Sequence, residues 1–124
     1  MTEKILLDTN FLVAPFQFSF DIFEELEKMY PYAEICTIQD AVQEAKSIKS
    51  GKYKDLVPQI IESEGISVYE TKGEGEVDDL LVDISEDFII ATNDKELKKR
   101  IMDEGRPVII IRGKDHLELK NGSI

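Results

Sequence analysis

The sequence predicts an α/β domain in which a parallel sheet is covered by helices on both faces. Short apolar runs of strand length alternate with amphipathic stretches of helix length between residues 5 and 111. This alternation is typical of repeated βαβ units. The chain of 124 residues has no internal repeat and no low-complexity linker, so we expect a single domain spanning residues 1–124.

Five segments are predicted to be strands because they are short, apolar and bounded by residues that favour turns. They are residues 5–9, 35–38, 66–69, 88–92 and 107–111. Crossovers between parallel strands are right-handed, which restricts the topology. A natural arrangement places the first strand centrally, beside the fourth. The carboxyl ends of these two strands would then meet near the topological switch point, where open α/β sheets bind ligands.

Five helices are predicted between the strands. They are residues 21–29, 40–50, 53–63, 76–86 and 95–104. Residues that end helices follow several of them, as Pro31 and Gly105 do. Pro58 lies inside the third helix and favours a kink or a break there. The polar segment from about Gly113 to the C-terminus is expected to be a loosely held tail.

Composition and charge argue against several function classes. The formal net charge of −11 argues against a generally basic nucleic-acid binder and leaves only local patches for phosphate contacts. The single cysteine, Cys36, excludes an intrachain disulfide and suits a reducing cytoplasm, where we expect the protein. The one histidine, His116, argues against a histidine-based zinc site. No segment has the character of a signal peptide or the length of a membrane span, so we expect no membrane association.

Two carboxylates stand where predicted strands end. Asp8 follows the first apolar run and Asp94 follows the fourth. Each has an alternative interpretation, because aspartate is a favourable N-cap and could simply begin a helix. Two such acids at the ends of different strands favour a shared site. Converging carboxylates repel one another, and a bound divalent cation usually offsets this repulsion. The strand ends therefore predict a metal site.

Helical geometry adds Asp78 and Glu44 to these candidates. At about 100° per residue, Asp78 lies at the border of the apolar stripe of its helix, whereas Asp79 lies on the polar side. Glu44 lies roughly 40° beyond the apolar stripe that contains Ile48, again at a border. An acid at such a border can reach over the sheet edge while its helix stays packed. The alternative, a glutamate that only faces solvent, stays open for Glu44.

Two basic runs follow these acids along the chain. One begins after Glu44 and the other after Asp94. Runs of this kind most often form a solvated helix face. The functional alternative is contact with the phosphates of a nucleic acid that leads into the acidic centre. The candidates for such contacts are Lys46, Lys49, Lys95 and Lys98.

Four segments together resemble PIN-domain nucleases over nearly the full length of the chain, in the style of archaeal PIN proteins, VapC-type toxins and rRNA-processing PIN domains. They are residues 5–10, 41–44, 77–81 and 89–98. The resemblance implies a three-layer α/β/α sandwich with a five-stranded parallel sheet. By position, the family's acidic quartet matches Asp8, Glu44, Asp78 and Asp94. Asn10 and Thr92 match polar positions often found beside that quartet.

The resemblance also implies an endoribonuclease that uses Mg²⁺ or Mn²⁺. One or two ions would activate water for attack on an RNA phosphate, so no protein nucleophile is required. The partners implied are RNA and either an antitoxin, for a toxin of a toxin–antitoxin pair, or a processing complex. The strongly acidic composition differs from what is expected of an enzyme that acts on RNA.

Two other function classes compete with this interpretation. A magnesium-binding phosphoacceptor receiver domain usually carries paired acids after its first strand and an acceptor aspartate after its third. Here Asp8 stands alone, and the third predicted strand ends without an aspartate. A non-catalytic interaction domain on the same fold would present an exposed aromatic patch to a protein partner. The candidates for that patch are Phe11, Phe16, Phe18 and Phe20. The alternative is that these rings complete the core or a homodimer contact.

Overall fold

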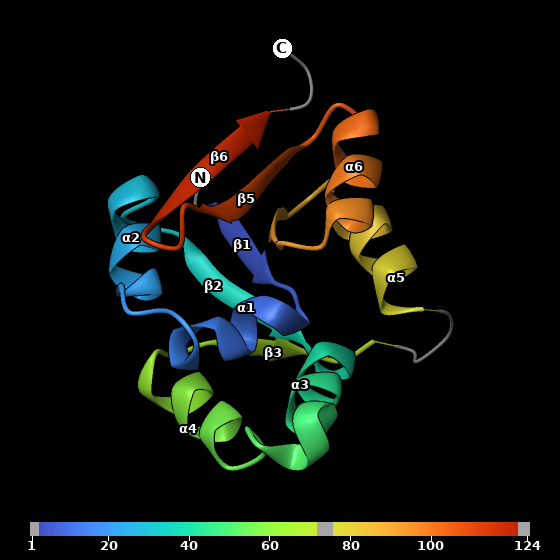
Figure 1. Cartoon of the computed structure of the whole chain (residues 1–124). Helices are drawn as coiled ribbons and strands as arrows, with labels where there is room; N and C mark the ends of the chain where they lie inside the picture. Colours follow the sequence, from blue (N-terminus) through green and yellow to red (C-terminus); the bar gives the residue numbers. More distant parts are fainter. Residues whose placement is uncertain (1–2, 72–75, 122–124) are drawn as a thin grey trace.

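A six-stranded sheet forms the centre of the computed structural model, which describes residues 3–71 and 76–121 (Figure 1). The strand order is β3-β2-β1-β4-β5-β6. The first five strands along the chain run parallel, and β6 is antiparallel to β5. The strands are β1 (Lys4–Leu7), β2 (Glu34–Ile38), β3 (Ser67–Tyr69), β4 (Ile89–Ala91), β5 (Pro107–Arg112) and β6 (His116–Asn121).

Helices lie on both sides of the sheet, which confirms the predicted α/β/α sandwich. Helices α5 and α6 pack beside each other on one side, and α1, α2 and α4 lie on the other (Figure 1). The helices are α1 (Thr9–Val13), α2 (Ile22–Met29), α3 (Gln39–Gly51), α4 (Leu56–Ser63), α5 (Val77–Ile84) and α6 (Lys95–Asp103). A short 3₁₀ helix, Ala14–Phe16, follows α1. Within the described part of the chain, none of these helices combines the length and apolarity needed to cross a membrane.

Strand β1 lies between β2 and β4, as the sequence predicted. Leu6 is in register with Cys36 of β2 and with Ile90 of β4. All three side chains are fully buried, because helices cover this part of the sheet from both sides. The chain runs outward from β1 in both directions, so the carboxyl end of β1 is the switch point of the sheet.

The C-terminal segment is a strand, so the prediction of a loosely held tail from Gly113 was wrong in this region. Strand β6 pairs with β5 along its whole length, from Arg112 opposite His116 to Pro107 opposite Asn121. The segment alternates polar and apolar residues, with Leu117 buried. This period of two is the signal for a half-buried strand, and it outweighs the overall polarity of the segment. The sheet therefore has six strands rather than five.

Two helix boundaries also differ from the predictions. Pro58 is the third residue of α4, in the first turn, where a missing backbone N–H costs no hydrogen bond. The helix therefore starts later than predicted and has no kink at Pro58. In α3, the backbone leaves helical geometry at Ile48, and Lys49 and Ser50 adopt positive φ angles of 50° and 57°.

The N-terminal aromatic residues belong to the core. Phe11 is fully buried, and Phe16, Phe18 and Phe20 are half-buried and pack against the core cluster. Phe16 also stacks on Tyr53, with 5.9 Å between ring centroids. This packing favours a structural role for the four rings over an exposed patch that binds a partner.

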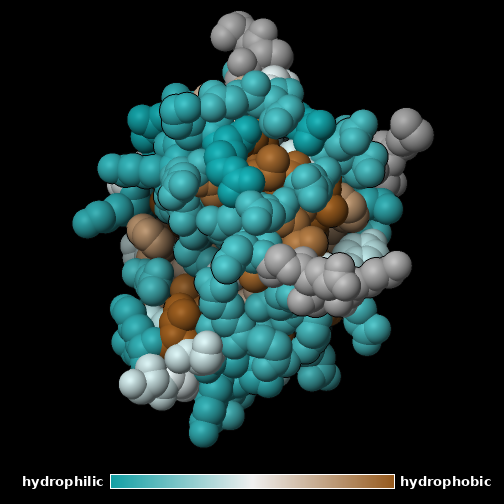
Figure 2. Space-filling model, turned by 90° about the vertical axis from the view of Figure 1, so that its right-hand side faces the viewer, coloured by the Kyte–Doolittle hydropathy of each residue, from teal (hydrophilic) through white to brown (hydrophobic). Residues whose placement is uncertain are grey.

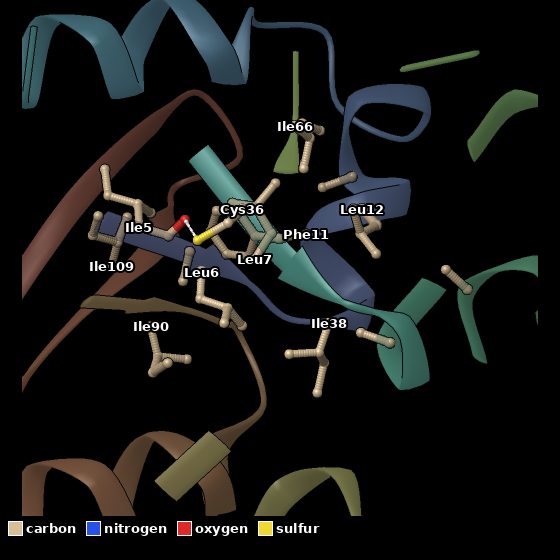
Figure 3. Packing of buried hydrophobic residues seen from close by; sticks show 14 of the residues in the cluster. Ile5, Leu6, Leu7, Phe11, Leu12, Cys36, Ile38, Ile66, Ile90 and Ile109 are labelled. Atoms are coloured by element: carbon tan, nitrogen blue, oxygen red, sulfur yellow. Dashed lines mark hydrogen bonds between the residues drawn. The ribbon is translucent and has the colours of Figure 1, made fainter. Parts of the chain in front are cut away.

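Cys36 is a small core residue, as predicted, and its sulfur donates a hydrogen bond to the carbonyl oxygen of Ile5 over 3.3 Å (Figure 3). Burial, together with the negative charge of Glu34, raises the pKa of the Cys36 thiol to about 12. The thiolate is the reactive form, so the native thiol should resist disulfide-exchange reagents at about pH 8. We expect rapid labelling only after unfolding in denaturant. Equal labelling rates for native and unfolded protein would contradict this burial.

Candidate active site

Asp8 lies at the carboxyl end of β1, where three hydrogen bonds fix its carboxylate. Its Oδ1 accepts from the backbone N–H of Thr9 over 2.7 Å. Its Oδ2 accepts from the hydroxyl of Thr92 over 2.6 Å and from Asn10 Nδ2 over 3.3 Å. The side chain is 4% exposed. Asp8 is therefore held in one orientation at the centre of the sheet edge.

Thr92 links the ends of β1 and β4. Its hydroxyl donates to Asp8 and accepts from the backbone N–H of Asp94 over 3.1 Å. Its backbone N–H continues the sheet by donating to Ile109. Thr92 and Asn10 thus lie where the family resemblance implied, against the carboxylate of Asp8.

The interpretation of Asp8 and Asp94 as N-caps is confirmed, and it is compatible with a place at a shared pocket. Asp8 is the N-cap of α1, and Asp94 is the N-cap of α6, where its Oδ1 accepts from the backbone N–H of Leu97 over 2.9 Å. Each residue also lines a pocket at the sheet edge. The cap bond of Asp94 uses one carboxylate oxygen, whereas both oxygens of Asp8 already accept hydrogen bonds and have only their remaining lone pairs for a ligand.

The four predicted acids line one pocket of about 260 Å³. Glu44 reaches it from α3 and Asp78 from α5, so the four side chains come from four separate parts of the chain. Val13, Gln17 and Ile48 also line this pocket. An adjoining pocket shares three of the acids and adds Glu76, Asp79 and Arg100.

The acids influence one another electrostatically. Burial raises the pKa of Asp8, and the charges of Asp78 and Glu44 add to this, against the opposing hydrogen bonds from Thr92 and Thr9. Burial, followed by the charges of Asp94 and Glu44, also raises the pKa of Asp78. Arg100 partly opposes that rise. A nearby cation would favour the ionised forms of Asp8 and Asp78, because an opposite charge stabilises a carboxylate.

Asp78→Asn should stabilise the metal-free protein. The pKa of Asp78 is raised in the folded state by burial and by Asp94, Glu44 and Glu96, with Arg100 opposing. Ionisation of Asp78 therefore lowers the free energy of unfolding. This loss grows as the pH rises from the ordinary aspartate pKa of 3.8 through the raised pKa of the folded state. In EDTA at about pH 7 the variant should unfold at higher denaturant concentration than wild type, and the difference should vanish in strong acid.

The control for this measurement is Asp83→Asn, which removes an exposed carboxylate from the same helix. A pH-independent difference between wild type and Asp78→Asn, or one of the same size in the control, would contradict the electrostatic origin of the effect.

Asp79 and Arg100 form a contact that the sequence did not reveal. Arg100 Nη2 donates to Asp79 Oδ1 over 2.8 Å, which joins α5 to α6 at the rim of the acidic pocket. The predicted distinction between Asp78 and Asp79 agrees with this arrangement, because Asp78 is half-buried and Asp79 is exposed. Figure 2 shows that the side of the molecule carrying α5 and α6 is largely hydrophilic. Only the packing of the two helices places this guanidinium beside the acids.

The four acids could hold a hard divalent cation such as Mg²⁺ or Mn²⁺, since such cations prefer oxygen ligands. Within residues 3–71 and 76–121, no three histidine, cysteine, aspartate or glutamate side chains already form a metal-ligating group. Mg²⁺ usually takes one or two carboxylates and keeps several waters, so it does not need such a group. Thr9 Oγ1 is also buried without a hydrogen-bond partner in the described structure, and Thr9 lines the same pocket. Such an atom normally binds water or a ligand.

The four candidate lysines lie on two helices. Lys95 and Lys98 are on α6 and line a separate pocket beyond Asn93. Lys46 is on α3, and Lys49 lies in the non-helical end of that helix. The two pairs therefore lie on different helices, and neither pair lines the acidic pocket itself.

Comparison with known proteins agrees with this architecture. The PIN like domain family matches residues 5–114. The chain belongs to this family. The PIN-like chain is also 26% identical over 125 residues to "Ribonuclease VapC4" of Methanocaldococcus jannaschii, an alignment that covers 94% of the chain and 95% of that protein.

A solved structure shares the fold of the PIN-like chain. It is described as the structure of the PIN domain endonuclease Utp24, with a TM-score of 0.77 and 23% identity. The superposition covers 95% of the PIN-like chain and 91% of the other. At this identity, the similarity shows the common fold.

Proposed function

We propose that this protein is a divalent-metal-dependent endoribonuclease that hydrolyses RNA phosphodiester bonds. The observation that carries the proposal is the pocket at the end of β1, where four carboxylates from separate elements converge. Membership of the PIN-like family and similarity to a ribonuclease support RNA as the substrate.

Asp8, Glu44, Asp78 and Asp94 would hold Mg²⁺ or Mn²⁺ in this pocket. A bound cation of this kind lowers the pKa of a water molecule and offsets the charge that develops on a phosphate. Other residues of the protein would position the metal ligands and the RNA. Thr92 and Asn10 hold the carboxylate of Asp8 in place, as hydrogen-bonding partners of metal ligands do. The guanidinium of Arg100 stands at the rim, where an anionic strand would approach.

Single-stranded RNA incubated with the protein tests the proposal. Cleavage should require Mg²⁺ or Mn²⁺ and stop in EDTA. The same cations should raise the thermal midpoint, because they would bind the folded state preferentially. An absence of both effects across millimolar Mg²⁺ and Mn²⁺ would refute the proposal and favour a non-catalytic interaction domain.

Two biological roles use this same reaction in the cytoplasm: processing of rRNA or other RNA, and action as the toxin of a toxin–antitoxin pair. They differ in partner, since the first implies a processing complex and the second an antitoxin. Expression in a host separates them. Growth arrest by the wild-type chain that is lost with Asp8→Asn favours a toxin, and normal growth with both chains favours a processing enzyme.

A further inference from the structure

We infer that a basic pocket between α6 and the end of β5 binds the RNA phosphate next to the scissile one. The inference rests on the proposed function, which places the scissile phosphate at the four acids. The pocket has a volume of about 310 Å³. Its lining residues are Asn93, Lys95, Lys98, Ile110, Ile111, Arg112 and Gly113.

The charge of this pocket differs from that of the chain as a whole. None of its seven lining residues is acidic, although the chain has 26 acidic and 15 basic residues. The pockets beside it are lined by several carboxylates. A local concentration of positive charge on an acidic protein favours an anionic ligand.

Two of the three cations in the pocket are free to bind an anion. Arg112 is already compensated, because its guanidinium contacts both carboxylate oxygens of Glu118 at 3.2 Å. Lys95 and Lys98 form no ion pair with the described residues, and Lys98 is half-buried. They are three residues apart on α6 and so project from the same side of the helix. Their two ammonium groups are the donors that we assign to the phosphate.

Asn93 fixes the wall between the basic and the acidic pockets. Its Oδ1 accepts from the backbone N–H of Ile111 over 2.8 Å, and its own backbone N–H donates to Asn10 Oδ1 over 3.2 Å. Asn10 in turn contacts Asp8. The wall consists of the consecutive residues Asn93, Asp94 and Lys95, which span at most about 7 Å. The two pockets are therefore lined by consecutive residues, which suits neighbouring phosphates of one strand, with one on each side of the wall.

The path of the RNA follows from this arrangement. A strand whose scissile phosphate lies at Asp8 and Asp94 would pass over Asn93 and place its next phosphate between Lys95 and Lys98. Because lysine contacts to phosphate carry no base information, this pocket should contribute affinity and register without sequence preference. It also explains how an acidic protein can hold RNA, since the favourable charge is local.

The test compares Lys95→Gln/Lys98→Gln with Lys28→Gln/Lys99→Gln. The control removes the same charge from lysines that are paired with carboxylates elsewhere on the surface. Fluorescent single-stranded RNA is titrated with each protein in Ca²⁺, over a series of salt concentrations, and its integrity is checked afterwards. We expect at least roughly tenfold weaker binding for the first variant, because it removes both charge-assisted hydrogen bonds to the phosphate. Its salt dependence should be shallower by about 0.7 for each phosphate that the protein no longer neutralises.

A second measurement locates the phosphate. Single phosphates of the RNA are replaced in turn by uncharged methylphosphonate. In wild type, the substitution next to the cleavage position should weaken binding, and in Lys95→Gln/Lys98→Gln the same substitution should have no further effect. Equal affinity and salt dependence in the two double variants would overturn the inference. Displacement of the RNA by inorganic phosphate at an equal concentration would also overturn the inference. It would indicate a site for a free anion.

These outcomes are independent of catalysis. Binding that depends on Lys95 and Lys98 without any divalent-dependent cleavage would refute the proposed nuclease and leave an RNA-binding pocket. Cleavage that proceeds with unaltered RNA affinity in the double variant would support the nuclease and refute the pocket.

Discussion

Asp8→Asn should abolish divalent-dependent RNA cleavage while the protein stays folded. The substitution removes the charge of the most buried acid in the pocket, and the new amide oxygen can still accept from the backbone N–H of Thr9. A bound cation contributes several kcal/mol of charge stabilisation to phosphate hydrolysis. Loss of the proposed central ligand of that cation should therefore lower the rate at least about a thousandfold. Single-turnover cleavage in Mn²⁺ measures this effect.

Asp83→Asn is the matched control for the activity measurement. It removes an exposed carboxylate outside the acidic pocket and should cleave RNA at the wild-type rate. Circular dichroism should give the same spectrum for all three proteins. Wild-type cleavage by Asp8→Asn would remove this residue from the mechanism, and an equal loss in both variants would indicate a non-specific effect of charge.

Phe11→Ala should have the largest effect on stability among the aromatic substitutions. Phe11 is fully buried in α1, three residues after Asp8, and belongs to the main core cluster. Truncation of a buried phenylalanine typically costs about 3–5 kcal/mol, because it loses transfer free energy and leaves a cavity. Native domains are stable by only about 5–15 kcal/mol, so this is a large fraction of the total. Urea denaturation monitored by circular dichroism measures the change.

Tyr32→Ala is the control for stability, because that side chain is 87% exposed. Its free energy of unfolding should lie within about 0.5 kcal/mol of wild type. A similarly small change for Phe11→Ala would show that the ring is not part of the core and would revive the alternative of an aromatic surface for a protein partner.

Much of the fold could be predicted because its signals are local. Residues close together in the sequence form the apolar runs of β1 and β4. Residues within one or two helical turns also form the stripe that separates Asp78 from Asp79. The central position of β1 followed from general rules of parallel sheets. Strand β6 is harder to predict, because its segment is polar overall and only the alternation around Leu117 indicates a strand.

The sequence by itself determined which residues are available for chemistry: carboxylates at strand ends and helix borders, and lysines after them. Only the tertiary structure decided how they meet. Thr92 contacts Asp8 across 84 positions, and Arg100 reaches Asp79 through the packing of α5 on α6. The pocket that Lys95 and Lys98 share with the end of β5 was decided in the same way. The physical reason is that periodicity reports the face of a single element, whereas a site at a sheet edge depends on how several elements pack.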